Sequence, residues 1–230
     1  MSPIPFDAVL FDCDGVLVDS EPITNRVLRD MLEELGWSMS LADCMRTFVG
    51  KAVKDEIDLI ESHTGTRITP EWLAQFRERR NEALDRELVE IAGAPAAVRA
   101  LHARLGGRIA CASGADRLKV ELQLEKIGLL DAFQGRVFSG HEMPRSKPAP
   151  DVYLAAARAL DADPRRCAVV EDTVTGAMAG LAAGATVFGY SPGGLGHSSA
   201  DALRAIGVVH IFVDMAQLPA VLAAHRMLDA

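Results

Sequence analysis

The sequence predicts an α/β protein in which a buried parallel sheet is combined with an inserted helical unit. Strand-like and helix-like segments alternate over the first 19 residues and again after about residue 93. Several strand-like segments, such as residues 9–11 and 168–170, are continuous apolar runs, which is typical of strands buried on both faces of a parallel sheet. Between these two parts, no strand pattern interrupts the helical spacing, which predicts the inserted unit.

The alternating part of the chain contains six expected strands and five expected helices. The strands are expected at residues 8–11, 108–112, 136–138, 168–170, 186–189 and 208–213. The helices are expected at residues 95–105, 116–127, 151–160, 174–183 and 216–224. Residues 118–124 alternate with a period of two, which favours a strand, but Asp116 can cap a helix and Gly128 can end it. We therefore expect a helix there.

The intervening residues have apolar positions at helical spacing. One apolar face comprises Val27, Leu28, Met31, Leu32 and Leu35. A second helix is expected to begin at Thr69, because its capping hydroxyl precedes Pro70 in the first turn. The apolar side of that helix comprises Trp72, Leu73, Phe76, Ala83, Leu84 and Leu88, and Trp37 is expected to join this core. We expect residues 19–91 to form a helical domain, and residues 1–18 and 92–230 to form the core domain.

Composition argues against several classes of partner. The 230 residues carry a net charge of −8, which offers no basic surface for nucleic acid. The uncharged residues 173–200 are too rich in glycine for a membrane span, and the N-terminus lacks the basic region of a signal peptide. The cysteines, which form no CxxC pair, are Cys13, Cys44, Cys111 and Cys167. These features predict a cytoplasmic protein without a membrane or nucleic-acid partner.

The most informative segment is the first expected strand, which ends in two carboxylates, Asp12 and Asp14, followed by Gly15. Two acids at the end of a buried strand are costly unless a metal or a proton compensates them. One carboxylate can attack phosphorus and form an aspartyl-phosphate, while the other transfers protons. An EF-hand calcium loop requires its glycine at the sixth position, whereas Gly15 is the fourth residue from Asp12. A solvated turn is the alternative without chemistry.

Two further signals lie at or near the ends of later strands. Ser113 and Gly114 offer a hydroxyl and backbone N–H groups that suit phosphate oxygens, although both are ordinary turn residues. Lys147 precedes Pro148, which favours an extended backbone suited to aiming one positive charge. Taken alone, Lys147 would be interpreted as an exposed surface lysine.

The fourth signal is the acidic pair Glu171 and Asp172, which ends another apolar strand. Hard oxygen ligands here could complete a Mg²⁺ site with Asp12, and N-capping of the next helix by Asp172 is a compatible structural role. Glycines recur every four residues in that helix and are expected to face the sheet, with the last near its end: Gly176, Gly180 and Gly184. The four signals together predict Mg²⁺-dependent phosphoryl transfer at one edge of the sheet.

With these residues in this order, the whole chain resembles the haloacid-dehalogenase superfamily, and within it the β-phosphoglucomutase-like phosphatases. The resemblance implies a Rossmann-like core with a helical cap inserted after the first strand. It implies Asp12 as the nucleophile and Asp14 as the general acid/base. By the same analogy Ser113 and Lys147 bind the phosphate, which agrees with the candidate backbone N–H groups at Gly114. Mg²⁺ would be held by Asp12, the backbone carbonyl of Asp14 and Asp172, with Glu171 as a direct or indirect partner.

Departures from the family pattern narrow the expected reaction. The sugar-phosphate mutases carry a cap histidine where this chain has Thr24, and a cap arginine after the glycine that matches Gly50. Here the nearby bases are Lys51 and Lys54, which are candidates for reading the leaving group. These differences favour simple hydrolysis over mutase chemistry. The dehalogenases of the superfamily lack the second aspartate, so Asp14 argues against dehalogenation. Phosphonate cleavage uses a cap lysine as a Schiff base, and apart from Lys51 and Lys54 nothing in the sequence supports it.

The expected function is hydrolysis of a small phosphorylated metabolite, such as a sugar phosphate or sugar-acid phosphate, by a monomer or a weak homo-oligomer. A phosphomutase is the alternative among enzymes. A phospho-accepting signalling domain is an alternative from another class, but such domains are about half this length and lack the helical insert. A catalytically idle binding protein is disfavoured because every motif residue is present.

Overall fold

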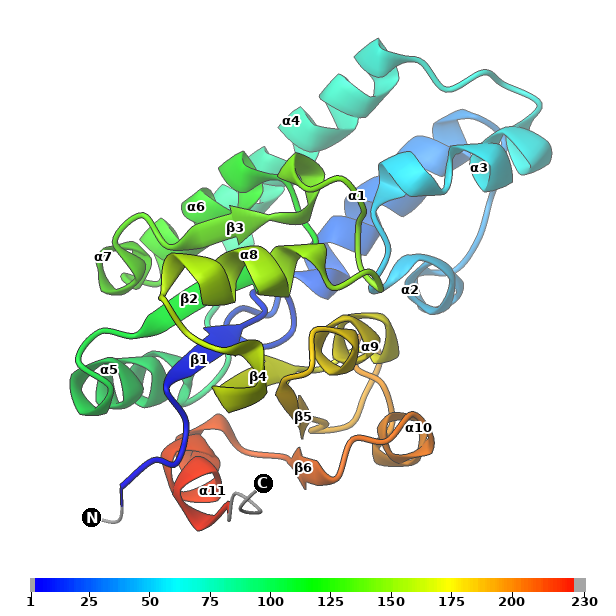
Figure 1. Cartoon of the computed structure of the whole chain (residues 1–230). Helices are drawn as coiled ribbons and strands as arrows, with labels where there is room; N and C mark the ends of the chain where they lie inside the picture. The colour runs from blue at the N-terminus through cyan, green and yellow to red at the C-terminus, as the bar shows by residue number, and fades with distance from the viewer. Residues whose placement is uncertain (1–2, 226–230) are drawn as a thin grey trace.

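The fold is a six-stranded parallel sheet with helices on both faces (Figure 1). Figure 1 shows the computed structural model, which describes residues 3–225. The strands are β1 Ala8–Phe11, β2 Ile109–Ser113, β3 Val137–Ser139, β4 Cys167–Glu171, β5 Thr186–Tyr190 and β6 His210–Phe212. Their order in the sheet is β3-β2-β1-β4-β5-β6, so the direction of winding reverses between β1 and β4. This reversal creates the crevice in which open α/β sheets bind ligands.

The register of the central strands brings their carboxyl ends to one edge of the sheet. Phe11, the last residue of β1, pairs with Val170 of β4. Ser113 ends β2 and Glu171 ends β4, while Asp12 follows β1 directly. Polar residues from three adjacent strands therefore lie at the edge where the winding reverses.

The two faces of the sheet are covered by different helices. One apolar cluster joins Val9 and Phe11 to α5 Ala94–Arg104, α6 Arg117–Lys126, α7 Leu130–Phe133 and α11 Leu218–Ala224. The other joins Ala8 and Leu10 to α8 Asp151–Ala159, α9 Val174–Ala182 and α10 Ala200–Ala205. Alternate side chains of β1 point to opposite faces, and both faces are buried, as expected for a central parallel strand.

A third apolar cluster lies within the segment that connects β1 to β2. Its helices are α1 Glu21–Glu34, α2 Leu41–Phe48, α3 Ile57–Thr64 and α4 Pro70–Glu87, and Figure 1 shows α1 to α3 and the outer part of α4 grouped to one side of the sheet. The cluster comprises Leu28, Met31, Leu32, Cys44, Phe48, Ile60, Ile68 and Phe76. Trp37 and Trp72 pack against it and are partly buried. These helices match the expected cap, whose division from the core at residues 19 and 91 stays a prediction.

All six expected strands are present; β1 has the expected bounds, and the ends of the other strands are shifted by at most two residues. The largest difference is β6, which covers His210–Phe212 rather than residues 208–213. The disputed segment 118–124 lies within helix α6, whose N-cap Asp116 accepts a hydrogen bond from the backbone N–H of Lys119. Gly128 follows that helix with φ 64°. The local helix signals therefore outweighed the period of two.

Several short elements were not predicted. The four-residue α7 and the six-residue α10 are too short to show a periodic pattern. The helix expected at residues 216–224 is divided into a 3₁₀ turn, Met215–Gln217, and α11. Helix α4 begins after the predicted cap Thr69 and ends at Glu87, so Leu88 lies outside it.

The glycine face of α9 packs against the sheet as predicted. A Cβ atom at Gly180 would lie 2.9 Å from Val187 and 3.0 Å from Val169, so only glycine fits this close approach. Gly184 adopts φ 86° shortly after the helix ends. All four cysteines are buried and free. No helix among residues 3–225 has the length and apolarity needed to span a membrane.

Candidate active site

The end of β1 places Asp12 beside a buried lysine. Nζ of Lys147 lies 2.8 Å from Oδ1 of Asp12 and 2.7 Å from Oε1 of Glu171. The Tyr153 hydroxyl donates to the same Glu171 oxygen at 2.6 Å. Burial raises the pKa of Asp12 to about 7, although Lys147 opposes the shift. Lys147 is thus a buried cation shared by two acids, and the interpretation of it as a surface lysine is wrong.

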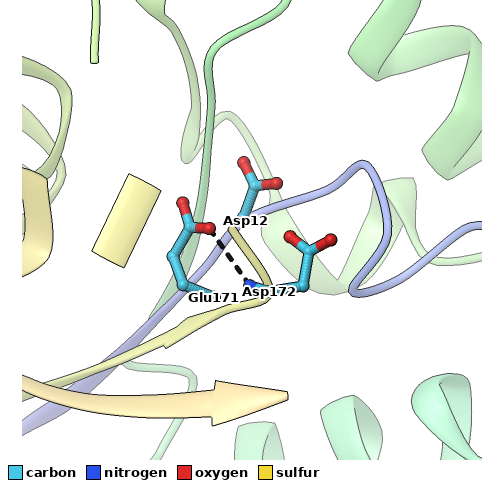
Figure 2. A group of neighbouring side chains, drawn as sticks. All are labelled: Asp12, Glu171 and Asp172. Carbon is cyan, nitrogen blue, oxygen red and sulfur yellow. Dashed lines mark hydrogen bonds between the residues drawn. The ribbon is translucent and has the colours of Figure 1, made fainter. Parts of the chain in front are cut away.

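Three buried carboxylates form a candidate metal site. Asp12, Glu171 and Asp172 offer oxygen atoms that lie within 4.8 Å of one another. Figure 2 shows these carboxylates extending to the same side of the strand ends. Both carboxylate oxygens of Asp172 are buried and have no hydrogen-bond partner in the described part of the chain. Burial, reinforced by Glu171, raises the pKa of Asp172 well above its usual value. Such an unpartnered carboxylate fits a hard divalent cation such as Mg²⁺.

Local backbone structure holds Glu171 in this arrangement. Its Oε2 accepts hydrogen bonds from the backbone N–H of Asp172 at 3.1 Å and from the Thr173 hydroxyl at 3.3 Å. A Cβ atom at Gly176 would collide with the Glu171 carboxylate, so this glycine makes room for it. The N-cap of α9 is Thr173, not Asp172. Asp172 is therefore left without the capping role that the sequence suggested.

The carboxylate of Asp14 lies in a different environment from the acidic cluster. Its Oδ1 is 2.7 Å from Nζ of Lys119 and accepts a hydrogen bond from Nε2 of Gln123 at 2.8 Å. The Ser20 hydroxyl donates to the same oxygen. Burial is the largest single influence on the pKa of Asp14 and acts to raise it. The charge of Lys119 and these hydrogen bonds together outweigh burial, so the pKa is lowered to about 2. The side chain of Asp14 is thus separate from the three-acid group, and a metal contact through its backbone carbonyl stays a prediction.

Ser113 and Gly114 lie where the sequence placed them, at the end of β2. The Ser113 side chain is fully buried, and its oxygen accepts a hydrogen bond from the backbone N–H of Ala115 at 3.1 Å. Gly114 lines the cavity above the strand ends. A cis peptide bond joins Lys147 to Pro148. A role for Ser113 and Gly114 in phosphate binding stays a prediction.

One cavity of about 120 Å³ joins the core residues to the helical segment. Its wall includes Asp12, Asp14 and Lys147 from the core, and Lys51 and Lys54 from the segment between β1 and β2. The two cap candidates differ in their partners. Lys51 is 3.2 Å from Glu56. Lys54 makes no ion pair within residues 3–225.

The sequence matches a known protein family over most of its length. Residues 6–184 match the haloacid dehalogenase-like hydrolases. The chain belongs to this hydrolase family. It is therefore an enzyme with the fold that the resemblance implied, a parallel α/β core with helices inserted after the first strand.

Several proteins to which this hydrolase is similar are named as phosphatases. The 6-phosphogluconate phosphatase of Escherichia coli (strain K12) is 33% identical over 183 residues, which cover 79% of this chain and 81% of that protein. Hexitol phosphatase B of the same strain is 32% identical and covers 76% of this chain and 79% of its own length. A solved haloacid dehalogenase family hydrolase from Deinococcus radiodurans R1, with bound phosphate and sodium, is 37% identical, covers 96% of both chains and has a TM-score of 0.76.

Sequence reasoning missed several residues of this hydrolase's site. Lys119 and Gln123 hold Asp14 and are spaced four apart on the buried face of α6. Polar residues on an otherwise apolar helix face were a usable signal. Arg80 of α4 is buried and lies 2.9 Å from Asp116 at the start of α6. This ion pair joins the inserted helices to the core, and sequence alone does not indicate it, since its partners are 36 residues apart.

Proposed function

We propose that this hydrolase is a Mg²⁺-dependent phosphatase of small phosphomonoesters, with a sugar phosphate or sugar-acid phosphate as substrate. The observation that carries the proposal is the pairing of Asp12 with Lys147 beside the unpartnered carboxylate of Asp172. This arrangement supports the proposal because an acid that can act as nucleophile and a buried cation lie beside carboxylates that could bind a second cation. The phosphatase relatives and the phosphate bound to the Deinococcus hydrolase support the same class of substrate.

The first half-reaction forms an aspartyl-phosphate. A carboxylate oxygen of Asp12 attacks phosphorus, and the bond between phosphorus and the leaving-group oxygen breaks. Asp14 gives a proton to that oxygen, so the leaving group departs as an alcohol. Lys147, the Ser113 hydroxyl and the backbone N–H of Gly114 are proposed to bind the phosphoryl oxygens.

The second half-reaction releases phosphate and restores the enzyme. Asp14, now ionised, takes a proton from water, which attacks phosphorus and frees the Asp12 carboxylate. The low pKa of Asp14 favours this basic form. A phosphate dianion beside Asp14 raises that pKa, which favours the acidic form needed in the first half-reaction. Mg²⁺ bound by Asp12, Glu171 and Asp172 would neutralise charge on the transferring phosphoryl group.

Phosphate release from a panel of esters tests the proposal. The panel contains 6-phosphogluconate, glucitol 6-phosphate, glucose 6-phosphate and p-nitrophenyl phosphate, each with Mg²⁺ and with EDTA. Asp12→Asn should abolish release, whereas the exposed Asp131→Asn serves as the matched control. Release that persists in EDTA would contradict the metal requirement. Isomerisation of a sugar phosphate without release would indicate a mutase.

The cytoplasmic location and the monomeric or weakly associated state stay predictions from the sequence.

A further inference from the structure

The cations around the cavity fall into two groups. Six positively charged side chains line it: Lys51, Lys54, Arg77, Arg80, Lys119 and Lys147. Four of these form the ion pairs described above. Lys54 and Arg77 have neither an ion pair nor a side-chain hydrogen bond in the part of the chain that the structure describes. Both come from the inserted segment, Lys54 from the 3₁₀ turn Val53–Asp55 and Arg77 from α4.

The acids of the cavity do not compensate these two charges. Each ionised acid of the wall is paired with another cation, as in the ion pairs of Asp12, Asp14 and Asp116. Glu21 is hydrogen-bonded to Asn25 at 2.9 Å, and burial raises its pKa to about 7. Asp55, beside Lys54 in sequence, is exposed and does not line the cavity. Among the side chains that line the cavity, those of the cap side therefore carry an excess of positive charge.

Lys54 and Arg77 share a neighbour in the cavity wall. His141, from the core loop after β3, lines the cavity there. Burial lowers the pKa of His141 to about 4; Lys54 and Arg77 add to this shift, and Asp116 and Asp55 oppose it. The charges of the two cations thus act on the same imidazole, which is uncharged at neutral pH. The Arg80–Asp116 ion pair, three residues further along α4, joins the helix that carries Arg77 to the start of α6.

An unpartnered hydroxyl also lines the cavity. Thr24 Oγ1 is buried and has no hydrogen-bond partner among residues 3–225. Buried polar atoms normally have a partner, so a hydroxyl left free in a cavity wall points to a polar ligand. Thr24, Lys54 and Arg77 share this cavity with Asp12. A ligand whose phosphate lies at Asp12 would extend toward the two free cations.

We propose that Lys54 and Arg77 form a subsite for a second anionic group on the leaving-group side of the phosphate ester. This inference rests on the proposed phosphatase function and narrows it. The substrate class becomes phosphomonoesters that carry a further carboxylate or phosphate, rather than neutral sugar phosphates. A guanidinium and an ammonium together can bind the anion through charge-assisted hydrogen bonds, with Arg77 able to bind it in a bidentate manner.

A matched pair of substrates tests the subsite. 6-Phosphogluconate and glucitol 6-phosphate have the same open carbon chain. They differ only at the end far from the phosphate, which is a carboxylate in 6-phosphogluconate and a hydroxymethyl group in glucitol 6-phosphate. The wild type should prefer 6-phosphogluconate in kcat/KM by about tenfold or more. Lys54→Met and Arg77→Met should each reduce this ratio by about tenfold. Arg79→Met, in the same helix but exposed and paired with Glu34, should leave the ratio unchanged. A sugar bisphosphate in the same assay distinguishes a second phosphate from a carboxylate.

Equilibrium binding to the Asp12→Asn variant gives the same ratios without turnover. A wild type that releases no phosphate from any ester, including p-nitrophenyl phosphate, would contradict the proposed function, while calorimetric binding still decides the subsite. Equal affinity for both esters, or a ratio that neither Lys54→Met nor Arg77→Met changes, would overturn the inference.

Discussion

The two sides of the cavity hold their charges in different ways. On the core side the cations are buried and paired, Lys147 with Asp12 and Lys119 with Asp14. On the cap side Lys54 and Arg77 have no partner in the described chain. Paired groups are already oriented before the substrate arrives, which is what stabilisation of a transition state requires. Unpaired cations instead gain their partner from the ligand, which is what recognition of different leaving groups requires.

The largest expected effect comes from the core side and should be independent of the leaving group. Asp12→Asn should lower kcat by at least about 10³-fold on every ester, because it removes the proposed nucleophile. Arg77→Met should instead change the ranking of the esters. Steady-state kinetics on both variants separates the two roles. If Asp12→Asn changed only the ranking, the division between the two sides would be wrong.

Loss of a cation should reduce the free energy of unfolding more on the core side than on the cap side. Lys119→Met leaves Asp14 buried without its cation and should cost about 3–5 kcal/mol in the free energy of unfolding. Adding Asp14→Asn should recover at least half of that loss. Arg77→Met should cost less than about 1 kcal/mol, because no ion pair is lost. Urea unfolding of the four variants measures these values, and additive effects of Lys119→Met and Asp14→Asn would contradict the pairing.

The acidic cluster predicts a pH dependence that a divalent cation reverses. In EDTA, Asp172→Asn should stabilise the protein by about 1–2 kcal/mol at neutral pH, since it removes an unpartnered buried carboxylate. The pKa of Asp172 is raised in the fold, so the stability that this group contributes is lost as pH rises above about 4, where Asp172 ionises in the unfolded chain. The gain from Asp172→Asn should therefore disappear near that pH.

Mg²⁺ should stabilise the wild type at neutral pH and have a smaller effect on Asp172→Asn. Thermal unfolding with and without Mg²⁺ checks this without reference to activity. Equal stabilisation of both proteins by Mg²⁺ would mean that Asp172 is not a ligand of the proposed metal site.

The glycine face of α9 should show an effect of packing on stability. Gly180→Ala should cost about 1–3 kcal/mol, because its Cβ atom would press against Val169 and Val187. Gly176→Ala should in addition weaken the Mg²⁺ response, since its Cβ atom would displace the Glu171 carboxylate. The same thermal unfolding experiment compares the two variants. A normal Mg²⁺ response in Gly176→Ala would mean that Glu171 tolerates displacement.

The core side of the site was largely predictable from the sequence. Each motif follows a strand, and the carboxyl ends of neighbouring parallel strands meet at one edge of a sheet. That rule alone predicts that Asp12 lies close to Glu171 and Asp172, as it does in the structure. The rule says nothing about which acid pairs with which lysine, so the contact between Asp14 and Lys119 was missed.

The cap side was less predictable because its geometry depends on how helices pack on one another. Lys51 and Lys54 were equivalent candidates in the sequence, yet only Lys51 has an acidic partner within residues 3–225. Arg77 belongs to a helix that packs on α1 and is joined to α6 by the Arg80–Asp116 ion pair. Local patterns carry no information on such a long-range contact, so Arg77 received no role from the sequence.

Trapping of the phosphorylated enzyme tests the central claim, that the core side carries out two-step chemistry on the phosphoryl group. Asp14→Asn lacks the proposed base but retains the nucleophile, and p-nitrophenolate leaves without needing a proton. Mixing this variant with p-nitrophenyl phosphate should give one rapid burst of nitrophenolate. Mass spectrometry of the quenched protein should then find the phosphoryl group on the peptide that contains Asp12. No burst, or a phosphoryl group on another residue, would contradict the account.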